Sequence, residues 1–269
     1  MESVNSKEQF IHLKVNRIIG NPSLINSKIT FEGSGNILYC ENNVNLVNAN
    51  IRFGGNNSLI YLSSSYSNYP IVLFIFQDSV AFIGRDNNMT APININVQEH
   101  QNLVIGDGGI IGSGVNIRTS DAHVIYDANS KKRINNSGSV LIGDHVWLGH
   151  LSYVSKGAKI GSGSIIDNYS YVSSNIQLDS NNLYGGNPIT LLKKGVFFTK
   201  DYVGNFNKGD SEAVDEYSSR IYLYSETPGE NLDFNRVDAM LKKFSVEEKL
   251  DFIQKLFIQN KKHNRFSIR

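Results

Sequence analysis

The feature that most constrains this chain is an aliphatic residue that returns at every sixth position in its central part. The uninterrupted series runs through Ile142, Leu148, Val154, Ile160, Ile166, Val172 and Leu178. A helix repeats every 3.6 residues and an isolated strand every two, so neither requires a six-residue step. A triangular β-helix does, because each flat side is a short strand plus a corner and three sides close a coil of about eighteen residues. The series therefore predicts an all-β solenoid.

The pattern continues upstream with less regular spacing. Six-residue steps also separate Ile105, Ile111 and Ile117. Looser steps separate Phe31, Ile37, Val44 and Ile51. We therefore expect the β-helix to cover residues 30–195. Residues 1–29 are expected to form an N-terminal cap, because an open coil end exposes strand edges that need covering.

The regular series is interrupted by an insertion at residues 119–139. The segment is rich in turn-forming residues and contains Lys131, Lys132 and Arg133 in succession. Insertions in a solenoid form loops that project from one corner, and such loops often carry function. A solvated hairpin without a functional role is the alternative.

The six-residue pattern stops after Gly195, so residues 196–269 form a C-terminal extension. Ser245 and Glu248 have the spacing of a capping box at a helix start. Apolar residues at helical spacing follow, namely Val246, Leu250, Ile253 and Phe257. We expect this amphipathic helix to pack on the β-helix or on a neighbouring subunit. A membrane surface is the alternative, because the chain end is basic.

Composition excludes several classes of protein. The chain has 26 Lys and Arg against 25 Asp and Glu, a net charge of +1, which gives no basic field for a nucleic-acid partner. A single cysteine excludes an internal disulfide and a multi-cysteine zinc site, and it fits a reducing compartment. The N-terminus lacks a signal-peptide pattern, and the longest apolar run, Ile71 to Phe76, is too short to span a membrane. We expect a cytoplasmic protein.

Three segments carry a resemblance to a known family. They are Thr119–His123 (TSDAH), Ile142–Gly149 (IGDHVWLG), and Gly185–Pro188 (GGNP) with the lysine pair that follows it. The chain resembles the hexapeptide-repeat, left-handed β-helix acyltransferases, particularly the polysaccharide and sugar O-acetyltransferases. Its long N-terminal coils and helical tail are similar to those of the sialic-acid capsule O-acetyltransferases of meningococcal type. The resemblance implies a left-handed parallel β-helix, a homotrimer with sites between neighbouring subunits, acetyl-CoA as donor, and no metal.

The resemblance also suggests catalytic residues. An alcohol is a poor nucleophile at neutral pH, so transfer of an acetyl group to a sugar hydroxyl needs a base. His123 is the expected base, since an imidazole can accept the hydroxyl proton and return it to the departing thiolate. Trp147, the only tryptophan, is expected beside the active cleft. The backbone N–H of His150 is the expected donor to the oxyanion.

Further positions are expected to contact the substrates. By resemblance, Asn168, Ser173 and the pair Lys193 and Lys194 fall where related enzymes contact coenzyme A. The chain departs from the family pattern there, with Asp167-Asn168 in place of Gly-Ala and Ser173-Ser174 in place of Thr-Lys. The acceptor is expected to be a hydroxyl of a bacterial surface polysaccharide, with capsule sialic acid one candidate. For a polyanionic acceptor, the candidate contacts are Lys131, Lys132 and Arg133, with Tyr126 as a stacking platform.

Alternative mechanisms remain open in the sequence. Cys40 lies far from the motifs, so direct transfer is expected in place of a covalent acyl-enzyme. Zinc-type carbonic anhydrases also use a left-handed β-helix, and His123, His145 and His150 offer three imidazoles for such a site. A β-helix acyltransferase of other specificity and a non-enzymatic carbohydrate-binding solenoid are the other candidates.

Overall fold

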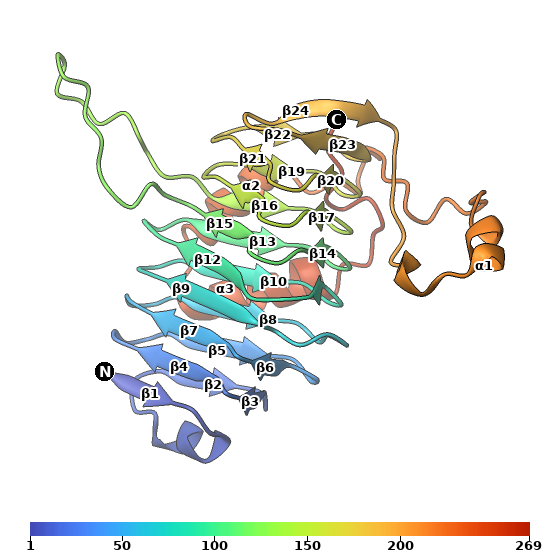
Figure 1. The fold of residues 1–269 in the computed structure, drawn as a ribbon. Coiled ribbons are helices and arrows are strands. Elements are labelled where there is room, and N and C mark those ends of the chain that lie inside the picture. Colours follow the sequence, from blue (N-terminus) through green and yellow to red (C-terminus); the bar gives the residue numbers. More distant parts are fainter.

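A computed structural model describes all 269 residues and shows three parallel sheets wound into a triangular β-helix (Figure 1). Sheet 1 contains β1 (Glu2–Val4), β4 (Lys28–Phe31), β7 (Asn50–Phe53), β9 (Ile71–Ile75), β12 (Ile93–Val97), β15 (Asn116–Arg118), β18 (Tyr153–Val154) and β21 (Tyr171–Val172). Sheet 2 contains β2 (Arg17–Ile19), β5 (Ile37–Cys40), β8 (Leu59–Leu62), β10 (Val80–Ile83), β13 (Asn102–Ile105), β16 (Val140–Ile142), β19 (Lys159–Ile160) and β22 (Gln177–Leu178).

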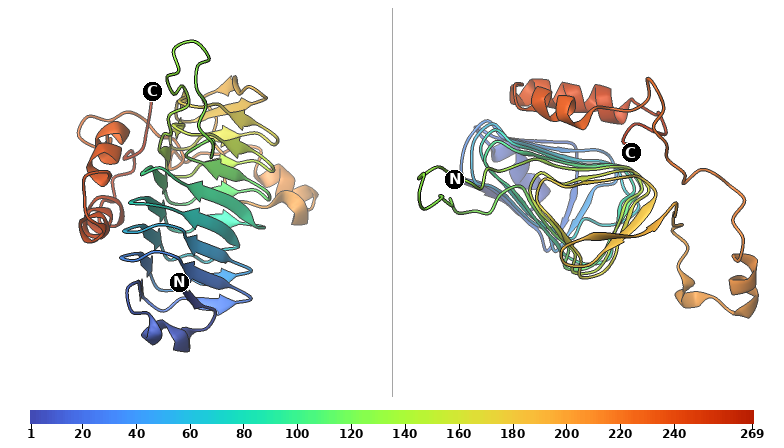
Figure 2. Two further views of the ribbon diagram at one scale, coloured as in Figure 1. Left: turned by 90° about the vertical axis from the view of Figure 1, so that its left-hand side faces the viewer. Right: turned by 90° about the horizontal axis from the view of Figure 1, so that it is seen from above.

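Sheet 3 forms the remaining side. It contains β11 (Asn88–Met89), β14 (Ile110–Ile111), β17 (Trp147–Leu148), β20 (Ile165–Ile166), β23 (Asn182–Gly185) and β24 (Thr190–Lys194). The separate pair β3 (Ser23–Ile25) and β6 (Asn45–Val47) occupies the same place in the first coils, between a strand of sheet 2 and a strand of sheet 1. Seen from above, the chain passes from sheet 1 to sheet 2 to sheet 3 clockwise as it rises towards the viewer (Figure 2). This is a left-handed turn, so the expected left-handed parallel β-helix is confirmed.

The inside of the prism is filled by the aliphatic residues of the sequence pattern. All seven members of the series from Ile142 to Leu178 belong to one core, and none is more than 3% exposed. The corners need unusual backbone angles, and Gly157 shows why glycine serves there. Its φ is +72°, and a Cβ at this position would lie 2.0 Å from Oδ1 of Asn175. The six-residue step therefore reflects one inward side chain and one tight corner per side.

The length of a coil changes along the solenoid. In the N-terminal part, Lys28 pairs with Asn50 of the next coil. In the C-terminal part, Leu141 pairs with Lys159 of the next coil, so the chain completes a turn there with fewer residues. The longer N-terminal coils have strands of four or five residues whose side chains alternate between the core and the outside. This difference explains the loose upstream spacing in the sequence.

The two ends of the solenoid are covered by antiparallel strands. At the start, β1 pairs with β4, followed by a short 3-10 helix, η1 (Lys7–His12). Parallel pairing begins at Arg17, so residues 17–29, which we expected in the cap, form part of the first coil. At the other end, β24 folds back on β23.

Two helices cover sheet 2 and leave sheets 1 and 3 open. They are α2 (Phe234–Leu241) and α3 (Val246–Ile253), and a π-helical turn, η3 (Gln254–Ile258), continues α3 (Figure 2). Ser245 and Glu248 form the predicted capping box. The helices share a second apolar core with outward side chains of sheet 2, which includes Tyr61, Phe82, Phe257 and Phe266. The amphipathic helix thus packs on its own β-helix.

Two segments stand away from the body, and we name them here. The projecting loop is residues 119–139, which leave the corner between sheets 1 and 2 (Figure 1). The arm is residues 199–221, which contain η2 (Val203–Asn205) and α1 (Lys208–Ala213). Seen from above, they project from opposite ends of the side that carries the helices (Figure 2). None of the helices has the length and hydrophobicity required to span a membrane.

Candidate active site

The projecting loop is a hairpin whose base is tied to the solenoid. Tyr126 and Arg133 form an antiparallel bridge near its tip. Two nitrogen atoms of the Arg133 guanidinium donate to the two carboxylate oxygens of Glu99, both at 2.7 Å. Hydrogen bonds from Arg133 and Ser137 lower the pKa of Glu99 to about 2. Arg133, expected as an acceptor contact, therefore anchors the loop.

A buried amide binds the backbone at His123 and Ile125 and the side chain of Asp121. Asn135 Nδ2 donates to the carbonyl of His123 at 2.8 Å and to Asp121 Oδ2 at 2.9 Å, and its Oδ1 accepts from the Ile125 amide at 2.8 Å. The buried Lys156 ammonium donates to the same Asp121 carboxylate at 2.5 Å, and this contact lowers the pKa of Asp121. The loop therefore presents His123 from a defined backbone.

The contacts that hold the loop were not predicted from the sequence. Asn135, Lys156 and Glu99 pair with residues 12 to 35 positions away. No periodicity marks them, because each partner lies at the same corner in a different coil or across the hairpin.

The His123 side chain is exposed and lines a cavity of about 240 Å³ beside the loop base. Phe76, Ser120, Asp121 and Arg133 also line it. The remaining candidate acceptor residues, Tyr126, Lys131 and Lys132, do not line this cavity. Ser173 follows β21 at the same corner of the prism as the loop.

Trp147 lies on a different side of the prism, on the outer surface of sheet 3. Its side chain is 38% exposed, and its ring centroid is 5.6 Å from that of Phe198. Along the sheet, the same outward row continues through Ile165 and Leu183 to Lys193 on the edge strand. Lys193 and Lys194 are both exposed. Sheet 3 thus brings Trp147 and Lys193 onto one face, and Lys194 follows on the same edge strand.

His150 and Asn168 lie at the third corner, between sheets 3 and 1. The backbone N–H of His150 donates to Asn168 Oδ1 at 2.7 Å. The amide expected to bind the oxyanion already has a partner, which corrects that expectation. The His150 ring accepts at Nδ1 from the Ser113 amide at 3.0 Å, so its neutral form carries the proton on Nε2.

His123 and Trp147 do not meet within one chain. The loop leaves the corner between sheets 1 and 2, whereas the indole lies on the outside of sheet 3. The cavity beside His123 contains no residue of sheet 3. A site that contains both side chains therefore needs a second copy of the chain.

His145 has a structural environment that argues against a shared metal site. Its ring is parallel to those of Phe198 and Tyr222, with centroids 4.0 and 4.3 Å away. Its Nε2 lies 2.8 Å from the Phe198 carbonyl and its Nδ1 lies 3.2 Å from the Gly108 carbonyl. Burial lowers its pKa. Both nitrogens thus face backbone oxygens, and the chain has no group of three or more His, Cys, Asp or Glu placed to hold a metal ion.

Cys40 lacks the environment of a nucleophile. It is buried in the core of the N-terminal coils, and burial raises the pKa of its thiol far above the usual value. A reactive cysteine needs a lowered pKa and access to solvent. This supports the expectation of direct transfer.

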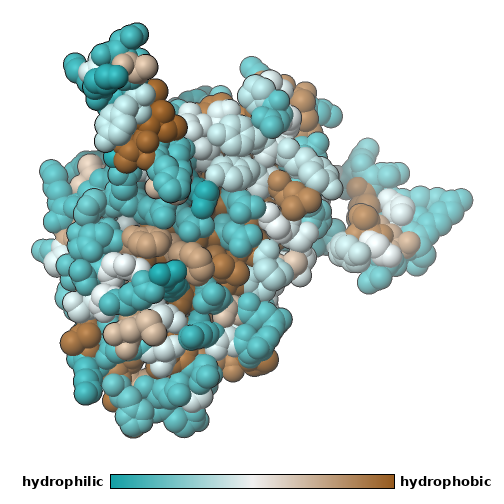
Figure 3. Space-filling model, turned by 60° about the vertical axis from the view of Figure 1, so that its left-hand side comes forward, coloured by the Kyte–Doolittle hydropathy of each residue, from teal (hydrophilic) through white to brown (hydrophobic).

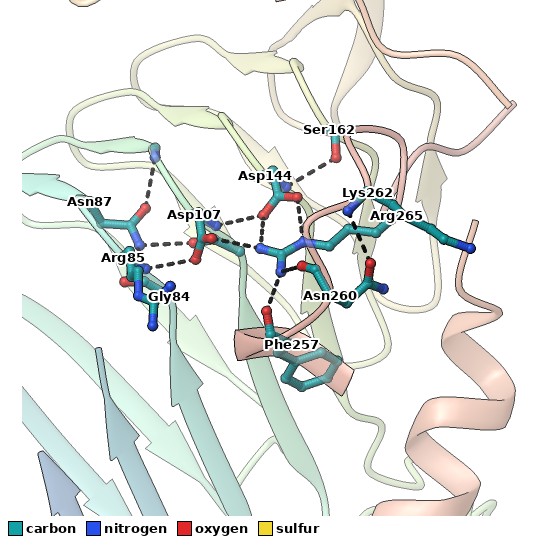
Figure 4. Close-up of polar contacts among 12 residues, drawn as sticks. Gly84, Arg85, Asn87, Asp107, Asp144, Ser162, Phe257, Asn260, Lys262 and Arg265 are labelled. Carbon is teal, nitrogen blue, oxygen red and sulfur yellow. Dashed lines mark hydrogen bonds and ion pairs between the residues drawn. The ribbon is translucent and has the colours of Figure 1, made fainter. Parts of the chain in front are cut away.

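A buried arginine fixes the C-terminal tail to the corner that precedes Trp147 (Figure 4). Arg265 donates to Asp144 at 2.7 and 2.8 Å and pairs with Asp107 at 2.9 Å. Asp144 also accepts from the Asp107 amide at 2.7 Å and donates its own amide to Ser162 Oγ at 3.0 Å. One side chain therefore joins the tail to consecutive coils of the solenoid.

Comparisons with known proteins agree with this fold. The family described as bacterial transferase hexapeptide (six repeats) matches residues 139–174. The polysialic acid O-acetyltransferase of Neisseria meningitidis is 29% identical over 151 residues, which is 56% of this chain and 69% of that protein. The enzyme of the same name from Escherichia coli O1:K1 / APEC is 31% identical over 122 residues, which is 45% of this chain and 39% of that protein.

Two solved structures match over most of their length. The polySia-specific acetyltransferase NeuO aligns with a TM-score of 0.60 and 26% identity, covering 74% of this chain and 93% of that one. The polysialic acid O-acetyltransferase OatWY aligns with a TM-score of 0.57 and 23% identity, covering 75% of this chain and 98% of that one. The repeats, the left-handed solenoid and these matches show that the chain is similar in fold to hexapeptide-repeat transferases, and similar in sequence to polysialic acid O-acetyltransferases over about half of its length.

Proposed function

We propose that this chain transfers an acetyl group from acetyl-CoA to a hydroxyl of a bacterial capsular polysaccharide, with a sialic acid polymer as the acceptor. The similarity to enzymes named polysialic acid O-acetyltransferases supports the acceptor class. The observation that carries the proposal is the position of His123, exposed beside a cavity on a loop whose backbone is held by Asn135 and Lys156. Because coenzyme A is a cytoplasmic metabolite, we place the reaction in the cytoplasm.

The proposed reaction is a direct transfer. The sugar hydroxyl attacks the thioester carbonyl while neutral His123 accepts the hydroxyl proton. The carbon–sulfur bond breaks as the carbon–oxygen bond forms, and the imidazolium returns the proton to the thiolate. General acid–base help of this kind contributes about 10²–10⁴-fold to the rate. The inert environment of Cys40 supports a route without an acyl-enzyme.

We place the site between copies of the chain in a homotrimer. The helices occupy sheet 2, so sheets 1 and 3 remain to form the subunit contacts. The loop of one copy then supplies His123, and sheet 3 of its neighbour supplies Trp147. Lys193 and Lys194 on the same sheet are exposed and available to the phosphates of coenzyme A. Asn168 and Ser173 lie at two other corners, and we propose that they line the groove for the pantetheine arm.

An acceptor panel with acetyl-CoA tests this proposal. Release of free coenzyme A thiol is followed with sialic acid polymers, other capsular polysaccharides and simple sugars. We expect thiol release with the sialic acid polymer and a loss of at least about a hundredfold in kcat for His123→Ala. The matched control is His12→Ala, which removes an exposed histidine at the N-terminal end of the solenoid.

Each result of the panel decides one part of the proposal. Transfer to another sugar would contradict the acceptor class and retain the enzyme class. If the chain binds the polymer without releasing thiol, and His123→Ala binds it equally well, the chain is a carbohydrate-binding solenoid and not a transferase.

A further inference from the structure

The arm beside Trp147 is fixed at both ends and leaves most of its side chains exposed. Phe198 and Tyr222 enclose the His145 ring where the arm leaves and returns. Asn181 adds a second attachment, since its Nδ2 donates to the Tyr222 carbonyl at 2.8 Å and its Oδ1 accepts from the Tyr224 amide at 2.6 Å. Between these points no residue of the arm is buried. The arm contacts its own body through Lys200, whose Nζ donates to the Asp86 carbonyl at 2.6 Å, and through Tyr217, whose ring centroid lies 5.2 Å from that of Phe197. Its remaining side chains are mostly exposed at the corner between sheets 2 and 3.

The exposed surface of the arm combines apolar and acidic side chains. Its large exposed apolar residues are Tyr202, Val203, Val214, Tyr217 and Ile221. Five large apolar side chains exposed within one segment of 23 residues favour a contact with another molecule. Asp215 and Glu216 are adjacent, and their carboxylates form no ion pair or hydrogen bond within the chain.

The projecting loop has the complementary character. Its stem exposes Val124, Ile125, Tyr126 and Ile134. In Figure 3 the projection has hydrophobic surface, coloured brown, below a hydrophilic tip. At that tip, the Lys131 and Lys132 ammonium groups form no ion pair or hydrogen bond within the chain. A basic pair above an apolar stem thus matches an acidic pair beside apolar side chains.

The topology places these two surfaces next to each other in a ring of copies. In the homotrimer proposed above, sheet 2 is covered by the helices, so we infer that the corner between sheets 3 and 1 points towards the symmetry axis and that sheet 1 of one copy faces sheet 3 of the next. The outer end of sheet 1 is the corner with the loop, and the outer end of sheet 3 is the corner with the arm. Each corner of a triangular prism spans about one sixth of a full circle, so three corners that meet at the axis fill only half of it. A wedge-shaped space therefore remains between sheet 1 of one copy and sheet 3 of the next. The loop and the arm flank the mouth of that wedge.

We propose that the arm of one copy clasps the projecting loop of the next copy. The apolar stem of the loop packs on Tyr202, Val203 and Tyr217, and Lys131 and Lys132 pair with Asp215 and Glu216. The inference rests on the proposed function, because the clasp holds His123 of one copy over Trp147 of the other. It assigns the two lysines to subunit contact in place of acceptor binding.

Disulfide cross-linking tests the clasp without reference to catalysis. The buried Cys40 is the only native cysteine, so Lys132→Cys with Glu216→Cys gives a clean pair. Mild oxidation should yield covalent dimers and trimers on a denaturing gel, whereas each single variant should yield no trimer. The control pair is Lys132→Cys with Lys243→Cys, which places the second thiol on the helical side of the molecule. Cross-linking of the target pair no better than the control pair would overturn the proposal.

Charge reversal distinguishes the clasp from acceptor binding. Lys131→Glu with Lys132→Glu should weaken trimer association about fivefold and lower kcat. Adding Asp215→Lys with Glu216→Lys should restore both properties. If the loop variant raises the KM for the acceptor, and the added arm substitutions do not return that KM to the wild-type value, the clasp is overturned. The two lysines would then be assigned to polysaccharide binding. Cross-linking does not depend on catalysis. A trimer that cross-links through the target pair but shows no acetyl transfer would therefore support the clasp and contradict the proposed function.

Discussion

At the scale of single residues, the position of His123 depends on side chains that do not react. Asn135 binds the His123 carbonyl and the Ile125 amide, and the Lys156–Asp121 ion pair holds the first strand of the loop. A base that must accept a proton in the transition state needs its position fixed to within a fraction of an ångström, since small displacements are costly in rate. Asn135 is therefore a positioning residue for the proposed base.

Replacement of Asn135 should test this role. Asn135→Ala removes four side-chain hydrogen bonds at the loop base, so we expect kcat to fall about ten- to a hundredfold while the KM for acetyl-CoA stays constant. Steady-state kinetics and the melting temperature are measured together. Asn129→Ala at the loop tip is the matched control. If the loss of kcat in Asn135→Ala is accompanied by a matching fall in the melting temperature, Asn135 has a structural role only.

His145 should make stability depend on pH. Burial lowers the pKa of the folded imidazole below its usual value of about 6.5. Above that pH the ring is neutral in both states. Below it the unfolded chain binds a proton that the folded chain does not, so the free energy of unfolding decreases as the pH falls through this range.

Urea denaturation at pH 7.5 and 5.5 measures this dependence. His145→Gln should be less stable at both pH values and should lose less stability on acidification than the wild type. His12→Gln is the control for an exposed imidazole. An equal loss of stability in His145→Gln and the wild type would contradict the assignment.

The sequence could indicate the chemically distinctive residues but not the residues that hold them in position through hydrogen bonds and ion pairs. His123 and Trp147 stand out because each occurs in one of the short motifs that carry the family resemblance. Asn135, Lys156 and Glu99 do not, because their roles arise only when separate coils stack. The same limitation applies to the His150 amide, whose partner, Asn168, lies one coil further on.

At the scale of elements, the C-terminal helices and tail are held on the solenoid by one buried ionic contact as well as by their apolar face. Arg265 is 3% exposed and joins the tail to Asp144 and Asp107. Removal of its guanidinium leaves two carboxylates without their counter-charge. Breaking a buried pair in this way costs about 3–5 kcal/mol.

The variant Arg265→Ala should therefore lose about 3 kcal/mol of unfolding free energy at neutral pH. Arg236→Ala, which removes an exposed arginine of α2, is the control and should lose little. Chemical denaturation compares the two. Equal stability of both variants would show that the apolar contacts alone fix the tail.

The regular elements were the most predictable part of the molecule. The short C-terminal coils follow directly from the six-residue step, because one inward residue and one corner define each side. The longer N-terminal coils were less predictable, because their strands alternate inward and outward side chains and follow the two-residue period of a strand. The arm carries no periodic pattern, and its attachment to His145 is purely tertiary.

At the scale of the whole molecule, a site that contains both His123 and Trp147 requires more than one copy of the chain. The helices occupy one side of the prism, and the proposed base and the indole lie on opposite sides of the unoccupied corner. A loop that exposes an apolar stem and an arm that leaves most of its side chains exposed are both explained by a neighbouring copy. The central claim is that His123 and Trp147 act together from different subunits.

Subunit complementation tests that claim most directly. His123→Ala and Trp147→Ala chains are each expected to be nearly inactive. Mixed and reassembled in equal amounts, they should recover about one quarter of the wild-type activity, because random assembly pairs an intact His123 with a neighbouring intact Trp147 at that frequency. The control is a mixture in which one chain carries both substitutions and the other carries His123→Ala. A target mixture that stays as inactive as this control would contradict a site shared between subunits.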